Sequence, residues 1–109
     1  METLELSPQD AKARLDNGNA VLIDVREPEE FALSRLDGAH LIPMQSIPAD
    51  LQKLEAMADH STLLILCHHG VRSLQVASWL RAQGIENCYS VVGGIDRWSR
   101  ELDATIPRY

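Results

Sequence analysis

The sequence predicts a three-layer α/β domain, in which a largely parallel central sheet of about five strands carries helices on both faces. Short apolar runs alternate with segments of helical periodicity along the whole chain, and this alternation is typical of parallel strands joined by right-handed crossovers. The run 63–66 is the clearest strand, because four apolar residues without a polar break indicate burial on both faces. A length of 109 residues suits one domain.

The individual elements are expected from start and stop signals in the sequence. Ser7 and Pro8 resemble the capped start of a helix that stops at Asn17 and Gly18. Further helices are expected at 28–36, 46–58, 72–83 and 94–102, and strands at 21–23, 39–42, 63–66 and 88–92. Residues 1–109 then form a single domain, of which 103–109 are expected to be a loosely ordered tail.

Composition and charge exclude several classes of protein. The net charge of −6 is spread along the chain without a basic stripe, so nucleic acid is not an expected partner. Residues 1–6 lack the basic start and apolar run of a signal peptide, and no apolar stretch is long enough to cross a membrane. We therefore expect a cytoplasmic protein without a membrane partner, where two cysteines favour a catalytic or core role over a disulfide.

A cysteine follows the strand 63–66 directly and carries the chemistry expected of the chain. Cys67 lies at the carboxyl end of this strand, where open α/β sheets place their binding crevice. A helix begins near Arg72, so the amides of residues 68–73 and the positive end of a helix dipole are expected to converge on the sulfur. Cys67 is then a nucleophile stabilised as a thiolate, Gly70 allows the turn, and Arg72 supplies fixed positive charge.

The loop that begins at Cys67 resembles the active-site loop of the rhodanese (sulfurtransferase) family. Its residues are Cys67, His68, His69, Gly70, Val71, Arg72 and Ser73. Three flanking segments are also similar to landmarks of that family, in the same order: 22–31, 38–43 and 92–98. The resemblance breaks at 34–36, where Ser-Arg-Leu replaces a common Gly-His-Ile.

The resemblance implies both the expected fold and an activity. In the family, the cysteine takes a sulfane sulfur from a small donor such as thiosulfate or a persulfide, and passes it to a thiol or protein acceptor. Cys67 would be the catalytic residue, and the amides from His68 to Ser73 would hold the terminal sulfur as an anion. Arg72 would steer an anionic donor or brace the loop. No cofactor and no metal are implied.

Two other functions remain open at this point. The domain could carry a persulfide to a protein acceptor with little turnover on small molecules. A cysteine-dependent phosphatase or arsenate reductase is the third possibility, because the fold also resembles that of the dual-specificity phosphatases that act on cell-cycle kinases. Their loop from cysteine to arginine is one residue longer, and the shorter loop 67–72 favours a single sulfur atom over a phosphate.

Several side chains near the loop have more than one possible role. His68 and His69 either orient the donor and tune the thiolate, or are simply solvated. Asp24 either supports the loop or Arg72, or caps a turn. The charged residues that follow are expected to form a solvated face, although one glutamate could pair with Arg72: Arg26, Glu27, Glu29 and Glu30. Cys88 is expected to be a small core residue out of disulfide reach of Cys67.

Overall fold

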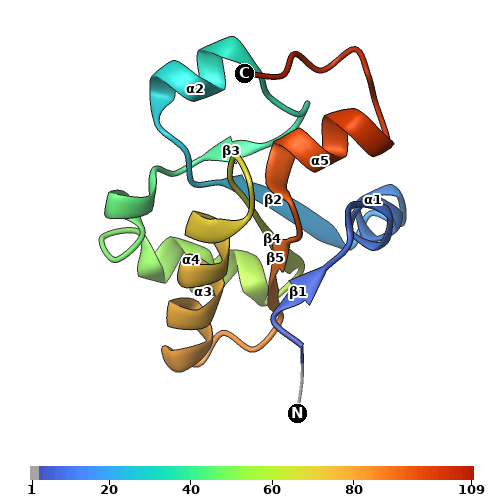
Figure 1. The fold of residues 1–109 in the computed structure, drawn as a ribbon. Coiled ribbons are helices and arrows are strands. Elements are labelled where there is room, and N and C mark those ends of the chain that lie inside the picture. Colours follow the sequence, from blue (N-terminus) through green and yellow to red (C-terminus); the bar gives the residue numbers. More distant parts are fainter. Residues whose placement is uncertain (1–2) are drawn as a thin grey trace.

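The protein is a five-stranded, entirely parallel sheet with helices on both faces, as the sequence predicts (Figure 1). The computed structural model describes residues 3–109, so the first two residues of the expected domain lie outside the described part. The strand order is β1-β5-β4-β2-β3. The strands are β1 (Glu5–Leu6), β2 (Ala20–Asp24), β3 (His40–Leu41), β4 (Thr62–Leu66) and β5 (Cys88–Val91).

The helices form the two outer layers. They are α1 (Pro8–Asp16), α2 (Pro28–Leu33), the 3₁₀ helix η1 (Met44–Ser46), α3 (Leu51–Ala58), α4 (Val71–Ala82) and α5 (Gly94–Glu101). Helices α3 and α4 cover one face of the sheet, and α1 and α5 cover the other (Figure 1). Ser7 caps α1 as expected, because its Oγ accepts a hydrogen bond of 3.1 Å from the amide of Asp10.

Strand β4 lies at the centre of the sheet and is buried on both faces. This confirms the strand that its apolar run predicts. Leu63 and Ile65 point into the core under α3 and α4, while Leu64 and Leu66 point into the core under α1 and α5. All four side chains are fully buried. The alternation follows from the strand period of two, so an unbroken apolar run is the pattern that a central parallel strand requires.

Three elements differ from the sequence-based expectation. The helix expected at 28–36 ends at Leu33, because the carbonyl of Ser34 accepts a hydrogen bond of 2.7 Å from Arg26 and Ser34 is extended. The helix expected from residue 46 begins only at Leu51, after tight turns through Pro48. Strand β1 was not among the expected strands, since two residues at a sheet edge carry no periodicity.

The segment 103–109 turns back after α5 and ends beside α2 (Figure 1). Ile106 packs into the core under α1 and α5, and its carbonyl accepts a hydrogen bond of 2.6 Å from Ser99. Arg108 forms an ion pair with Asp96 at 2.9 Å. These contacts bring Tyr109 to the carboxyl edge of the sheet. Across residues 3–109, no helix has the length and apolar character needed to cross a bilayer.

Candidate active site

Cys67 lies at the carboxyl edge of the sheet, directly after β4. The register pairs Leu66 with Asp24 on β2 and Ile65 with Ser90 on β5, so three strands end around the cysteine. The Cys67 side chain is only 1% exposed, because the loop 67–73 folds over the sulfur. The sulfur therefore lies under this loop, at the edge where parallel sheets bind their ligands.

The loop directs a backbone amide at the sulfur. The amide of Gly70 donates a hydrogen bond to Cys67 Sγ at 3.0 Å. Gly70 has a φ of 99°, a left-handed conformation that favours glycine, and a Cβ there would lie 3.0 Å from the amide nitrogen of Gly93. Helix α4 begins at the next residue, Val71, so the positive end of the helix dipole lies beside the sulfur. The side chain of Val71 is exposed. This geometry stabilises negative charge on Cys67.

Two buried hydroxyls continue the polar surroundings of the sulfur. Cys67 Sγ and Ser73 Oγ are 3.3 Å apart in a hydrogen bond donated by the thiol. Ser73 Oγ is also 2.7 Å from Ser90 Oγ, and both serines are fully buried. Because a hydroxyl rotates freely, Ser73 can accept from Ser90 and donate to the sulfur once the thiol has lost its proton.

The N-terminus of α5 holds the first residues of the loop. The amide of Ile95 donates to the carbonyl of Cys67 at 2.8 Å, and the amide of Asp96 donates to the carbonyl of His68 at 3.1 Å. Gly94 has a φ of 61°, and a Cβ at this position would collide with both of those carbonyls. Gly94 thus permits a close approach between helix and loop that no other residue allows.

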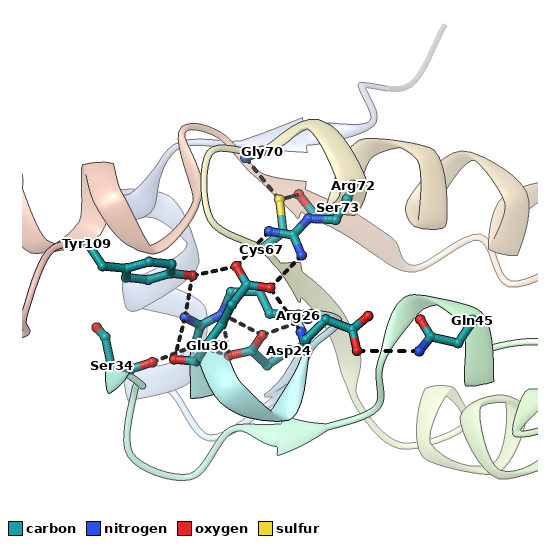
Figure 2. A network of polar contacts seen from close by, with 11 residues as sticks. Asp24, Arg26, Glu30, Ser34, Gln45, Cys67, Gly70, Arg72, Ser73 and Tyr109 are labelled. Carbon is teal, nitrogen blue, oxygen red and sulfur yellow. Dashed lines mark hydrogen bonds and ion pairs between the residues drawn. The ribbon is translucent and has the colours of Figure 1, made fainter. Parts of the chain in front are cut away.

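Arg72 braces the loop against α2 (Figure 2). Its guanidinium donates to both carboxylate oxygens of Glu30, at 2.7 and 2.9 Å. The hydrogen bonds from Arg72 lower the pKa of Glu30 from 4.5 to about 2, and Glu30 in turn raises the pKa of Arg72. Of the two roles considered for Arg72, the structure displays the bracing one, with one glutamate as its partner.

Asp24 and Arg26 form a fully buried ion pair below this brace (Figure 2). The two side chains are 2.6 Å apart, and Arg26 also donates to the carbonyls of Ser34 and Glu30. Burial opposes the charge of Arg26, but Asp24 and Tyr109 more than offset it and raise its pKa. The expectation that Arg26 lies on a solvated face is wrong. Asp24 bonds Arg26 rather than Arg72, and Arg26 in turn contacts Glu30 and Tyr109.

Of the two histidines after the cysteine, His68 is stacked on Tyr109, whereas His69 is exposed and lies tilted against His68. The ring of His68 lies 3.9 Å from that of His69 and 3.9 Å from that of Tyr109, nearly parallel to the tyrosine at 5°. Burial, with the positive potential of His69, lowers the pKa of His68. Its Nε2 is buried and has no hydrogen-bond partner among residues 3–109. The described residues 3–109 contain no group of three side chains arranged to hold a metal ion.

Ser90 and Tyr109 are site residues that the sequence reasoning missed. Ser90 has a signal, because it is a polar residue inside the otherwise apolar run 88–92. Tyr109 has none, because its position depends on the path of 103–109 and not on local periodicity.

Comparisons with known proteins agree with this geometry. A profile of the Rhodanese-like domain matches residues 7–101. The chain is 38% identical over 100 residues to the thiosulfate sulfurtransferase GlpE of Actinobacillus succinogenes, covering 92% of this chain and 87% of that protein. It is 39% identical over 94 residues to Rhodanese-like/PpiC domain-containing protein 12, chloroplastic, of Arabidopsis thaliana, covering 83% of this chain but only 30% of that longer protein. The human single-domain sulfurtransferase TSTD1 superposes with a TM-score of 0.80 at 25% identity, covering 92% of this chain and 98% of that one.

Proposed function

Because this chain belongs to the rhodanese-like family, we propose that it is a sulfurtransferase that moves a sulfane sulfur from a donor such as thiosulfate to a thiophilic acceptor through a persulfide on Cys67. The observation that carries the proposal is the position of this cysteine, with the Gly70 amide on its sulfur and the N-terminus of α4 beside it. Relatives named thiosulfate sulfurtransferase, similar over most of their length, support the choice of donor.

The first half-reaction is a substitution at sulfur. The Cys67 thiolate attacks the outer sulfur of thiosulfate, a new sulfur–sulfur bond forms, and the bond to the sulfonate sulfur breaks. Sulfite leaves with the electron pair of that bond, so the total charge does not change. The product is a Cys67 persulfide anion.

The second half-reaction returns the enzyme to its starting state. A thiolate or cyanide acceptor attacks the terminal sulfur, and the Cys67 thiolate leaves with the electron pair. Electron pairs move only between the reacting atoms, so neither half-reaction calls for a redox cofactor or a metal.

The residues of the loop have separate roles in these two steps. The Gly70 amide and Ser73 hydroxyl stabilise the thiolate, and the amides from His68 to Ser73 form the cradle for the terminal sulfur. Arg72 keeps the cradle in shape through Glu30. The short spacing from Cys67 to Arg72 gives a cradle that suits one sulfur atom better than a phosphate. The whole unit is proposed to be the single domain 1–109.

Steady-state kinetics with thiosulfate and cyanide test the proposal. We expect Cys67→Ala to abolish thiocyanate formation, while the matched variant Cys88→Ala keeps the wild-type rate within about twofold, because Cys88 is a core residue away from the loop. Turnover that survives in Cys67→Ala would overturn the mechanism. Cys67-bound sulfur without steady-state turnover would assign the domain as a persulfide carrier, and Cys67-dependent hydrolysis of an aryl phosphate would assign a phosphatase.

A further inference from the structure

Tyr109 lies over the loop of the candidate active site, although 42 residues of chain separate it from Cys67. Figure 2 shows its ring beside the Glu30 carboxylate, at the side of the network away from Gln45. Its side chain is 40% exposed, so burial of its own apolar surface does not account fully for this position. Its contacts with other residues of the site help to explain the position.

The ring and the hydroxyl of Tyr109 make separate contacts. The ring stacks on His68, the residue after the cysteine, with centroids 3.9 Å apart and planes at 5°. The hydroxyl accepts a hydrogen bond of 2.8 Å from Arg26 Nη1 and donates one of 2.8 Å to Glu30 Oε2. Glu30 Oε2 also accepts from Arg72 at 2.9 Å. Tyr109 therefore touches both the start of the loop and the brace at its end.

Contacts along residues 103–109 fix the position of Tyr109. Ser99 holds the carbonyl of Ile106 at 2.6 Å, and Arg108 pairs with Asp96. The amide of the same Asp96 donates to the carbonyl of His68. Helix α5 is thus a common anchor for the loop and for the segment that carries Tyr109.

We propose that Tyr109 is a positioning residue for sulfur transfer: its ring fixes His68, and its hydroxyl ties the Glu30–Arg72 brace to the buried Arg26. The inference rests on the proposed function, since it concerns how the cradle around the Cys67 persulfide keeps its shape. Tyr109 acts through His68 and Glu30, and takes no part in the bond changes at sulfur. A cradle that is already arranged lowers the barrier to transfer, while a loosened one has to be ordered in each cycle.

Two substitutions separate the two contacts. Tyr109→Phe keeps the ring on His68 and removes the hydroxyl from Glu30 and Arg26, whereas Tyr109→Ala removes both. Tyr89→Phe is the matched control, because Tyr89 is the other tyrosine of the chain and its ring contacts the guanidinium groups of Arg14 and Arg81.

The first readout is the rate at which Cys67 gains sulfur from excess thiosulfate, followed by rapid-quench mass spectrometry. We expect this rate to fall about tenfold in Tyr109→Ala and about threefold in Tyr109→Phe, with the full one-sulfur adduct reached in both. Tyr89→Phe is expected to match the wild type. A Tyr109→Ala rate within about twofold of wild type would overturn the proposal.

The second readout is the titration of the His68 ring by NMR, assigned with His68→Asn. The charged and titratable groups facing His68 are His69, Glu30, Asp96 and Tyr109. Removing the ring in Tyr109→Ala exposes the imidazole, so its midpoint should rise, while Tyr109→Phe should leave it unchanged. An unchanged midpoint in Tyr109→Ala would show that the ring does not cover His68, which contradicts the proposal.

The two readouts separate this inference from the proposed function. If the wild type gains no sulfur, the proposed function fails, and the His68 titration still tests where Tyr109 lies. If the wild type gains sulfur and Tyr109→Ala gains it equally fast, only the present inference fails. Thermal melts of all variants report whether they fold, and Tyr109→Phe, which keeps the ring, carries the test should the alanine variant unfold.

Discussion

The two cysteines of this protein are both free and both buried, yet their surroundings are opposite. Cys67 follows the carboxyl end of β4 and accepts a hydrogen bond from the Gly70 amide at 3.0 Å. Cys88 begins β5 at the other end of the sheet, where its Sγ lies 3.5 Å from the carbonyl oxygen of Ala77 and 3.6 Å from that of Ile85. One sulfur faces a backbone donor and the other faces backbone acceptors.

This contrast shows that burial alone does not decide what a cysteine does. Burial raises the pKa of Cys88, and nearby Arg81 only partly opposes it, so this side chain stays a thiol and behaves as a small core residue. The register pairs Cys88 with Leu63, four residues before Cys67. At about 3.3 Å per residue, this separation of about 13 Å is beyond the reach of a disulfide.

Alkylation of the native protein gives the largest expected difference between the two cysteines. Near neutral pH, iodoacetamide should modify Cys67 at least about 100-fold faster than Cys88, because the Gly70 amide donates to the Cys67 sulfur whereas burial keeps Cys88 a thiol despite nearby Arg81. Peptide mass spectrometry after brief labelling measures both rates in one sample. Equal labelling of the two sites would mean that the surroundings of the loop do not activate Cys67.

Gly94→Ala tests whether the position of the loop accounts for the reactivity of Cys67. The added Cβ collides with the carbonyls of Cys67 and His68, so we expect sulfur transfer to fall about 10- to 100-fold. Gly84→Ala is the control, because Gly84 also has a positive φ, of 101°, but open space around it. The positive φ alone costs about 1–2 kcal/mol in each variant, and only Gly94→Ala should lose activity beyond what its melting temperature explains. Equal activity in the two variants would rule out this role for Gly94.

Ser90→Ala tests the hydroxyl pair beside Cys67 without touching Cys88, which lies two residues earlier on the same strand. The substitution removes the partner that holds Ser73 Oγ at 2.7 Å. We expect kcat/KM for thiosulfate to fall about three- to tenfold, a smaller loss than removing a direct donor to the reacting atom. Kinetics equal to wild type would mean that the buried serine pair is only structural.

Much of the fold and the core of the candidate site could be predicted from the sequence, because their signals are local. The apolar run 63–66, the glycine of the loop and the helix that begins at Val71 all carry short-range signals. These signals were enough to predict Cys67, Gly70 and Arg72 as residues of the site.

Other parts of the site depend on contacts between distant residues. The burial of Arg26 depends on how the chain closes around its pair with Asp24, and an arginine among acidic residues is usually exposed. The position of Tyr109 depends on contacts of residues 103–109 with α5, which no periodicity reveals.

Glu30→Gln gives the smallest expected effect. It tests whether the ion pair between Glu30 and Arg72 stabilises the part of the molecule around Cys67. Because the pKa of Glu30 is lowered from 4.5 to about 2, its contribution to stability is complete above about pH 4.5 and is lost as the pH falls through about 2. At neutral pH the variant should therefore melt at a lower temperature than wild type, and this gap should close in that acidic window. A gap that persists to the lowest pH would contradict this role for the pair.

Intact-mass spectrometry after exposure to thiosulfate tests the central claim most directly, namely that the loop makes Cys67 the sulfur acceptor. We predict a gain of one sulfur atom in the wild type and in Cys88→Ala, its reversal by cyanide, and no gain in Cys67→Ser. Sulfur that still adds to Cys67→Ser, or a wild-type protein that gains none, would contradict the account.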